Sequence, residues 1–558
     1  MSVVVVLGAL ALFYFFGYRK WSVYLAEKVF GLSADERTPA HDPNLRDDVD
    51  YMPVDKHVLW GHHYTSIAGA APIIGPAVAV IWGWVPALIW IVFGTIFMGA
   101  VHDFGALVLG ARHQGRTMGD IAGEVIHPRV RLLLQVVIYF LIWVVLAVFA
   151  FAIGVLFTKY PATVIPVNFE IFVAIGIGYL FYKKGVPILW PSIIALVLLY
   201  VMVAVGVNFP LRLDAVLPGD AMINWAILLL IYAAVASVMP IWLLLQPRDF
   251  INSHQLIVGL SLLILGLLVL HPEIQAPAFN LNPEGAPPIL PLLFVTIACG
   301  SISGFHGLVG SGTTSKQLNN MADARAIGYG GMLGEGTLAV IATVAVAAGL
   351  SDWGSHYHSW NSSGINAIAN FVAGAGTFLE ALYLPKGWAQ AVVAVLAISF
   401  AATSMDTAAR IQRLVVAELG TQLGWNFLTN RYVATAVAVG PAIPLVLAGP
   451  KVWGPLWMLF GTTNQLIAAM SLLVLFVYLY RAQKPTMVIA VPMLFLVAMT
   501  LVAMGMNLMT WLSSYGTENA TAGMLTITLG TVIFVCEIWM VVEAVLILQK
   551  LKADRAAS

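Results

Sequence analysis

The sequence predicts an all-α polytopic membrane protein, and its composition, its apolar runs and the placement of its basic residues all indicate that class. Of the 558 residues, 60% are hydrophobic and 10% are charged, whereas soluble domains have about 45–50% apolar and about 25% charged residues. The 27 basic and 27 acidic residues balance, so nothing suggests the clustered basic face that binds nucleic acid. We therefore expect membrane lipid and a small-molecule substrate as partners, and no nucleic acid.

Apolar runs predict about fifteen transmembrane helices, since a helix needs about 20 residues to cross a bilayer. A weaker stretch, 364–384, contains Gly374 and Gly376 and is expected to form a re-entrant or interfacial helix. The fifteen runs cover residues 3–18, 64–82, 83–110, 131–158, 163–182, 188–208, 222–246, 254–271, 289–312, 326–350, 388–408, 432–449, 453–480, 486–512 and 522–549.

The basic residues predict the topology. With the N-terminus outside, fifteen spans place 23 of the 27 Lys and Arg residues on the inner side and four on the outer side, a strong positive-inside bias. A full span at 364–384 would reverse every later loop. The C-terminus then lies inside, and the expected location is the inner, or cytoplasmic, membrane. The four outer residues are Lys159, Arg212, Lys386 and Lys451.

The spans divide the chain into five parts. Residues 1–63 hold the first span and a polar cytoplasmic loop, and 64–208 hold a first group of five spans. Residues 209–288 hold two inserted spans, 289–480 a second group of five with the interfacial helix, and 481–558 two final spans and a short tail. The two groups of five cross the membrane in opposite directions, which predicts an inverted repeat. The loop before the second span is acidic, with Asp47, Asp48, Asp50 and Asp55. This acidic loop is expected either to fold over the inner mouth of the transport path or to be a solvated tether.

Two spans contain residues that interrupt helices. Pro72, Gly75 and Pro76 lie near the middle of the second span, and five glycines lie within 299–314 of the ninth. Proline removes an amide donor, and glycine weakens a helix. In transporters with inverted repeats, substrate binds at the midplane between two such broken helices. The alternative is that small residues let neighbouring helices pack closely.

Several long motifs link the sequence to a known family. They are WGHHY at 60–64 leading to GAAPIIGP at 69–76, GAVHDF at 99–104, GFH at 304–306 and TSMDTAAR at 403–410. With these motifs, the chain resembles over nearly its whole length the carbon-starvation protein A family of bacterial and archaeal membrane transporters. The resemblance implies a LeuT-type five-plus-five inverted repeat with extra helices, and uptake of peptides or pyruvate.

The eleventh span carries the candidate cation site. Thr403 and Ser404 resemble the Thr-Ser pair that helps to coordinate sodium in LeuT-type symporters. Oxygen ligands suit a hard cation, and we expect carbonyls of the broken second span, those of Ala68 and Ala71, as partners. The alternative is that both hydroxyls bond to carbonyls of their own helix.

Four ionisable residues within spans are candidates for a proton relay or gate. They are His102 and Asp103 in the third span, Glu335 in the tenth and Asp406 in the eleventh. Ionisable groups inside a membrane are functional candidates by default, and histidine titrates near neutral pH. Gate or packing roles are the alternatives for the first two, and a structural role for Glu335. For Asp406 we expect an ion pair with Arg410, four residues on.

The substrate is expected between the two broken spans. Amides and hydroxyls of the ninth span suit an anion, while polar residues of the thirteenth span either face substrate or hydrogen-bond between helices. The expected substrate-binding residues are Gly69, Ala70, Ala71, Gly75, Ser301, Ser303, Gly304, His306, Asn464 and Gln465.

No metal site other than the one for sodium is expected. His62, His63 and His306 have no obvious Cys or carboxylate to complete a ligand set. We therefore expect no cofactor, and only Na+ or H+ as a coupling ion.

The predicted function is a cation-coupled symporter that imports a small organic solute, with pyruvate or a similar monocarboxylate as the expected substrate. A peptide transporter of the same fold is the alternative, and a solute channel ranks below both, because broken helices also build selectivity filters. An enzyme is not expected, because the chain has neither a phosphate-binding glycine loop nor a zinc-type His-Glu-x-x-His motif.

Overall fold

The computed structural model describes residues 3–48, 50–187, 189–360, 364, 366–514 and 520–557. Every regular element in this part of the chain is a helix, and the one β-type contact is an isolated bridge between Val54 and Leu318. Twelve helices are long and apolar enough to cross a membrane, or thirteen if one bent pair is a single span. The chain is thus an all-α, multi-pass membrane protein, as predicted.

These thirteen match thirteen of the fifteen predicted spans. Residue 188, at the edge of one of them, lies outside the described residues. The helices are α1 (Val3–Phe16), continued by π-helical turns and α2 (Ser22–Tyr24) to Val29; the bent pair α3 (Lys56–Ile67) and α4 (Ala71–Ala79); α5 (Trp84–Gly94) with α6 (Ala100–Arg112); α8 (Pro128–Lys159); α9 (Val164–Lys184); α10 (Leu189–Asn208); α11 (Ala221–Val238); α12 (Leu245–Leu270); α16 (Gly330–Ala348); α20 (Lys386–Leu423); α23 (Trp453–Arg481); α24 (Met487–Ser513); and α25 (Ala520–Ala557).

The other two predicted spans are divided into short helices. The ninth consists of α13 (Ile289–Thr296), α14 (Ala298–Ser301) and α15 (Gly304–Gly312), and the twelfth consists of α21 (Arg431–Val439) and α22 (Ala442–Leu447). The predicted re-entrant or interfacial stretch forms α19 (Ala367–Glu380), which packs against α4, α12, α16 and α20. Residue 365 of that stretch lies outside the described part. The division into five parts and the direction of each span remain predictions.

Five helices extend by eight or more residues beyond their predicted bounds, because polar residues in them lowered the local hydropathy. The first helix continues from residue 18 to Val29, and α3 begins at Lys56 rather than 64, where the Asp55 side chain accepts a bond from the His57 amide at 2.8 Å. Helix α20 ends at Leu423 rather than 408, α25 ends at Ala557 rather than 549, and α12 begins at Leu245 rather than 254. The first turns of α12 are polar yet buried, so this stretch is helical although its low hydropathy predicts a loop.

The acidic loop before α3 packs against the protein rather than forming a free tether. The Val54 amide donates to the Gln317 carbonyl at 3.1 Å, and the Tyr51 hydroxyl donates to the Gln114 carbonyl at 3.1 Å. The Lys316 ammonium lies 5.1 Å from the centre of the Tyr51 ring. Burial lowers the pKa of Lys316, against the opposing effect of Asp50. The contacts contradict a solvated tether, whereas the position of the loop over an inner mouth stays a prediction.

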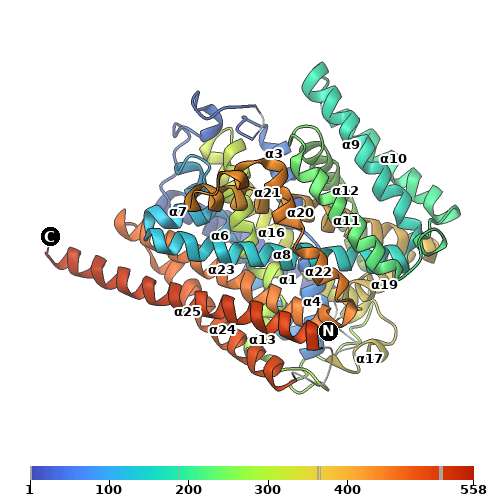
Figure 1. Ribbon diagram of the computed structural model, residues 1–558. Helices are drawn as coiled ribbons and strands as arrows, with labels where there is room; N and C mark the ends of the chain where they lie inside the picture. Colours follow the sequence, from blue (N-terminus) through green and yellow to red (C-terminus); the bar gives the residue numbers. More distant parts are fainter. Residues whose placement is uncertain are drawn as a thin grey trace.

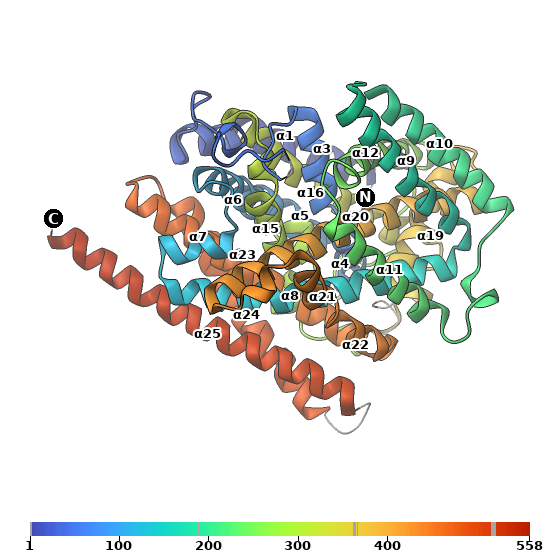
Figure 2. The ribbon, with the colours of Figure 1, turned by 45° about the horizontal axis from the view of Figure 1, so that its top comes forward.

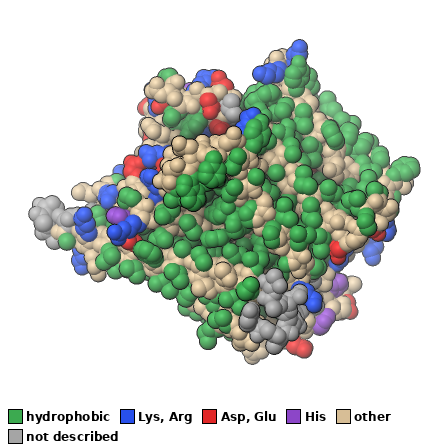
Figure 3. Space-filling view, viewed as in Figure 1, with side chains coloured by type: hydrophobic (Ala, Val, Ile, Leu, Met, Phe, Trp, Pro, Cys, Tyr) green, Lys and Arg blue, Asp and Glu red, His purple; other side chains and the backbone are tan. Residues whose placement is uncertain are grey.

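The helices are arranged around α8, which packs against α20, α11 and α23. The pair α9 and α10 lies at one side of the molecule, and α24 and α25 lie along the opposite side (Figures 1 and 2). Two short helices, α7 (Met118–Val125) and α17 (Trp353–His356), lie between the longer ones in the chain. Hydrophobic side chains cover most of the face in Figure 3, and charged ones gather at its edges. This distribution suits a surface that contacts lipid acyl chains.

Candidate substrate and cation site

The second span breaks where its sequence predicts. Helix α3 ends at Ile67, Ala68 leaves the helical region with φ −77° and ψ 64°, and α4 begins at Ala71 with Pro72 in its first turn. The two segments are bent by 46°. Proline is well placed there, because the first amides of a helix have no intrahelical partner.

The ninth span breaks between α14 and α15, where Ile302 and Ser303 are extended. Asn464 of α23 fills this break: its Oδ1 accepts from the Phe305 amide at 2.9 Å, and its Nδ2 donates to Ser303 Oγ at 3.0 Å. Gln465 Nε2 donates to the Phe294 carbonyl of α13 at 2.7 Å. Both polar residues of the thirteenth span thus hydrogen-bond between helices, which was one of the two roles expected for them.

The two broken spans touch each other and their neighbours closely. A Cβ on Gly75 would lie 2.4 Å from the Thr296 carbonyl oxygen, and one on Gly304 would lie 2.4 Å from that of Asn464. Only glycine permits such backbone approaches. The sequence suggested either broken helices or close packing of neighbouring helices through small residues. The structure has both in these two spans.

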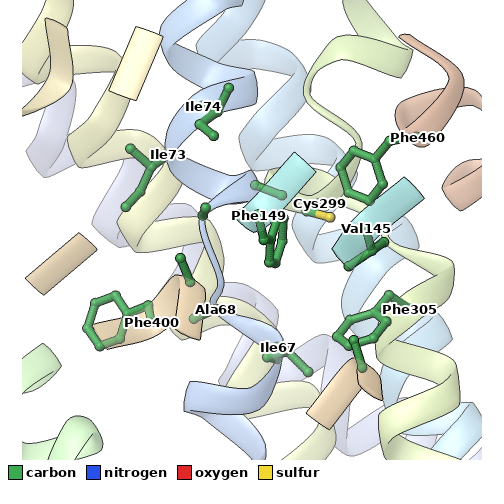
Figure 4. Close-up of a cluster of buried hydrophobic side chains, with 14 of the residues drawn as sticks. Ile67, Ala68, Ile73, Ile74, Val145, Phe149, Cys299, Phe305, Phe400 and Phe460 are labelled. Atoms are coloured by element: carbon green, nitrogen blue, oxygen red, sulfur yellow. The ribbon is translucent and has the colours of Figure 1, made fainter. Parts of the chain in front are cut away.

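An apolar cluster surrounds the breaks (Figure 4). The expected residues Ala70 and Ala71 are buried beside it, and Ser301 Oγ is buried without a hydrogen-bond partner among the described residues. Gly69 lies against Phe149 and Ser404. The cluster's labelled side chains, none of them charged, are Ile67, Ala68, Ile73, Ile74, Val145, Phe149, Cys299, Phe305, Phe400 and Phe460.

The hydroxyl pair of the eleventh span bonds across helices rather than within its own. Ser404 Oγ donates to the Ser66 carbonyl at 3.0 Å, and Thr403 Oγ1 accepts from Asn252 Nδ2 of α12 at 2.9 Å. The contact with the broken second span is therefore present, but the carbonyl bonded to Ser404 belongs to Ser66 rather than to Ala68 or Ala71. The last turn of α3 remains helical up to Ile67, and this brings the earlier carbonyl into reach.

Three of the four proton-relay candidates form one chain of contacts with His306. His102 Nδ1 lies 2.8 Å from Asp103 Oδ1, Asp103 Oδ2 lies 2.9 Å from His306 Nδ1, and His306 Nε2 lies 3.1 Å from Glu335 Oε2. All four side chains are fully buried. His306, predicted to contact substrate, thus joins residues from α6 and α16 into one acid–histidine chain that starts in the first turn of α15.

The fourth candidate, Asp406, lies in a different cluster. It pairs with Arg248 of α12 and accepts a bond from the Tyr232 hydroxyl at 2.8 Å. Arg410, its expected partner, instead lies 3.4 Å from Asp50. The predicted Asp406–Arg410 pair is wrong, because α12 begins earlier than expected and brings a nearer guanidinium. The sequence signal that was missed is the charged and amide-bearing stretch 246–253 directly before an apolar run.

The histidines do not assemble a metal centre. His62 pairs with Asp249, and His63 Nδ1 lies 2.9 Å from Thr314 Oγ1. Within the described ranges, no group of three or more His, Cys, Asp or Glu side chains is arranged to hold a metal ion.

Two interrupted, buried spans that face each other beside buried ionisable groups define a polytopic membrane protein of the secondary-transporter class. The particular family is shown by sequence: the profile of "Carbon starvation protein CstA" matches residues 1–366 and 358–503. The chain belongs to this family, which the motifs had suggested.

Named relatives differ in their substrates. The chain is 30% identical over 501 residues to "Peptide transporter CstA" of Bacillus subtilis, covering 82% of each protein. It is 31% identical over 559 residues to the protein of the same name from Escherichia coli K12, covering 88% of this chain and 79% of the relative. It is 36% identical over 343 residues to "Pyruvate/proton symporter BtsT" of the same organism, covering 60% of this chain and 47% of the relative.

Solved structures show only distant likeness. A variant of the manganese transporter from Eremococcus coleocola aligns with a TM-score of 0.49 at 12% identity, over 90% of this chain and 99% of that one. MhsT in complex with L-phenylalanine aligns with a TM-score of 0.46 at 12% identity, over 88% and 99%.

Proposed function

We propose that this protein is a secondary active transporter of the cytoplasmic membrane that couples the entry of a cation to the import of a small monocarboxylate such as pyruvate. The observation that carries the proposal is the meeting of two broken spans in an apolar cluster, with a buried acid–histidine chain starting at one of the breaks. Such an arrangement provides a place for a small solute and a place for a proton side by side.

The substrate's carboxylate would bind at the start of α15. The N-terminus of a helix favours anions, because its first amides lack partners and the helix dipole is positive there. Asn464 fills this break, since its Oδ1 accepts from the Phe305 amide and its Nδ2 donates to Ser303 Oγ, so the substrate's carboxylate would have to replace these bonds. The apolar side chains in Figure 4 suit the rest of a small molecule better than a second charge.

A peptide is the second candidate, favoured by the names of the Bacillus subtilis and Escherichia coli relatives. A zwitterionic peptide needs an acidic partner for its amine, and Glu335 is the natural residue in this region. Glu335 already lies 3.1 Å from His306 and is fully buried. An ion pair with His306 would compete with a substrate amine, which favours the monocarboxylate.

The acid–histidine chain supplies the site for the coupling ion, and a proton suits it best. Two carboxylates, Asp103 and Glu335, face one imidazolium if His306 is charged and His102 neutral, so one negative charge remains. Buried charge without a partner is strongly unfavourable, and one proton removes it. The name of the relative BtsT supports a proton, while Thr403 and Ser404 keep sodium as the other candidate.

The test is uptake of labelled pyruvate by proteoliposomes that contain the purified protein. Proton and sodium gradients are imposed separately, and an unlabelled dipeptide is added as a competitor. Saturable accumulation driven by the proton gradient and unaffected by the dipeptide is expected. The absence of pyruvate accumulation under both gradients contradicts the proposal. If the dipeptide abolishes pyruvate accumulation, a peptide becomes the favoured substrate.

A further inference from the structure

The first turns of α12 carry a second buried polar cluster, outside the acid–histidine chain. Arg248, Asp249 and Asn252 are each at most 1% exposed, although α12 lies outside both predicted repeats. Burying such side chains in a membrane protein is unfavourable unless each finds a partner or a function. Their partners come from α3, α9, α11 and α20.

The cluster contains more negative than positive charge. Arg248 pairs with Asp406, and its Nε lies 3.8 Å from Glu170 Oε1. Asp249 pairs with His62 and accepts from Ser66 Oγ at 3.3 Å. The cluster thus contains three carboxylates and one guanidinium, which contacts Asp406 and Glu170. With all three carboxylates ionised, the excess is two negative charges if His62 is neutral and one if it is protonated.

The other ionisable groups around the cluster do not remove this excess. The Tyr232 hydroxyl donates to Asp406 and accepts from Arg248 at 2.5 Å, so it adds no positive charge. Arg410, one turn further along α20, has its own carboxylate partner in Asp50. The excess therefore requires a bound cation or proton, because uncompensated buried charge is strongly destabilising.

Unpaired oxygen atoms show where such a cation would bind. Asp249 Oδ1 and Asn252 Oδ1 have no hydrogen-bond partner among the described residues, and both side chains are almost fully buried. The two residues are three apart on one helix, so their side chains share a face. The Asn252 amide reaches Thr403 of α20 at 2.9 Å, and Asp249 reaches α3 through Ser66.

We propose that Asp249 and Asn252 of α12 form a binding site for a small monovalent cation, either Na+ or a proton, separate from the His306 chain. Carboxylate, amide and hydroxyl oxygens are the ligands that hard cations prefer. The site connects an inserted helix to the break of the second span, because Ser66 is one residue from the end of α3. Its role in transport rests on the proposed function, but cation binding itself is measurable without transport.

The experiment uses the purified full-length protein in lipid nanodiscs, with two arms that distinguish the two cations. The first arm measures binding of radioactive sodium, and the second measures proton uptake in weakly buffered solution. If the site takes sodium, Asp249→Asn is expected to weaken sodium binding by roughly tenfold or more, about 1.4 kcal/mol. If it takes a proton, the same variant takes up one proton fewer per molecule and the wild type binds no sodium.

Two further variants serve as controls. Glu537→Gln removes a buried carboxylate of α25 that is hydrogen-bonded to Thr500 and lies outside the cluster, so sodium binding should stay unchanged. Glu335→Gln removes the proton of the proposed transport mechanism, and its effect on proton uptake should add to that of Asp249→Asn. If the losses of proton uptake in the two variants add, the α12 site and the His306 chain bind their ions independently. Failure of one proposal then leaves the other intact.

Wild-type behaviour of a folded Asp249→Asn protein in both arms overturns the inference. If that variant does not fold, Asn252→Ala replaces it, because it deletes an unpaired oxygen without changing the charge. It is expected to weaken sodium binding or to shift the pH at which the proton is taken up. No change in either quantity equally overturns the inference.

Discussion

Replacing Glu335 by Gln removes one ionisable group from the acid–histidine chain while keeping its size and a polar contact to His306. In the native chain, Glu335 Oε2 lies 3.1 Å from His306 Nε2, and Asp103 lies on the other side of the imidazole. The amide cannot take up a proton, so Asp103 and His306 remain as a neutral pair. We expect a protein that binds substrate but no longer couples its movement to the proton.

The distances indicate how large the change is. Two unit charges 3.1 Å apart attract by about 5 kcal/mol at an effective dielectric constant of about 20, so the native carboxylate strongly affects the charge on His306. If one proton moves with each substrate anion, a gradient of one pH unit supplies about 1.4 kcal/mol, or roughly tenfold accumulation. Glu335→Gln is therefore expected to reduce the accumulation ratio from about ten to about one.

Two assays on the same proteoliposomes separate coupling from binding. Net uptake of labelled pyruvate under a proton gradient measures coupling, and exchange of external labelled for internal unlabelled pyruvate measures substrate passage without net proton movement. We expect Glu335→Gln to lose the first and keep the second. Wild-type accumulation by the variant refutes the role of Glu335 in coupling, and loss of both activities indicates a structural role instead.

Three further predictions concern the hydroxyl pair, the close glycine contact and the acidic loop. Ser404→Ala loses the bond to the Ser66 carbonyl, so any sodium-dependent uptake should need roughly tenfold more sodium, about 1.4 kcal/mol, while uptake that is driven only by protons stays unchanged. Gly304→Ala places a Cβ 2.4 Å from a backbone oxygen, so thermal unfolding should occur several degrees lower, about 1–3 kcal/mol of overpacking, whereas Gly8→Ala, with no atom within 4 Å, should be neutral. Because burial lowers the pKa of Lys316, the packed loop holds the ammonium less well than an opened loop would, so rising pH should discharge Lys316, stabilise the packed loop and slow its proteolysis. Lys316→Met should abolish this pH dependence, and equal cleavage rates at neutral and alkaline pH in the native protein would rule it out.

Most of the spans were predictable because their signal is local. An apolar run of sufficient length has few alternatives to a membrane helix, and this applies to α8 and α24, whose bounds lie within three residues of prediction. The break of the second span was also local, since proline interrupts a helix in any surroundings. The failures are polar helical turns at the starts of α3 and α12, where hydropathy falls although burial persists.

The candidate site was predictable only in part, because pairing depends on which helices meet. His102 and Asp103 are adjacent in sequence, but nothing local connects them to His306 and Glu335, which are about 200 residues further on. At Asp406 the sequence suggested a local partner that the structure does not use. Arg410 lies four residues on, but Asp406 pairs with Arg248 of α12 and Arg410 pairs with Asp50 of the acidic loop.

The position of α12 changes how the inserted spans are understood. From the sequence they are additions to a core of two repeats, yet Asn252 contacts Thr403, Asp249 contacts Ser66, and Arg248 holds Asp406. All three partners belong to the second and eleventh spans, the pair expected to bind the cation. A movement of the break in the second span relative to α20 would therefore also displace the carboxylates held by α12. The inserted helix is thus a structural part of the proposed cation site, and its removal would leave the buried Asp406 of α20 without its guanidinium partner.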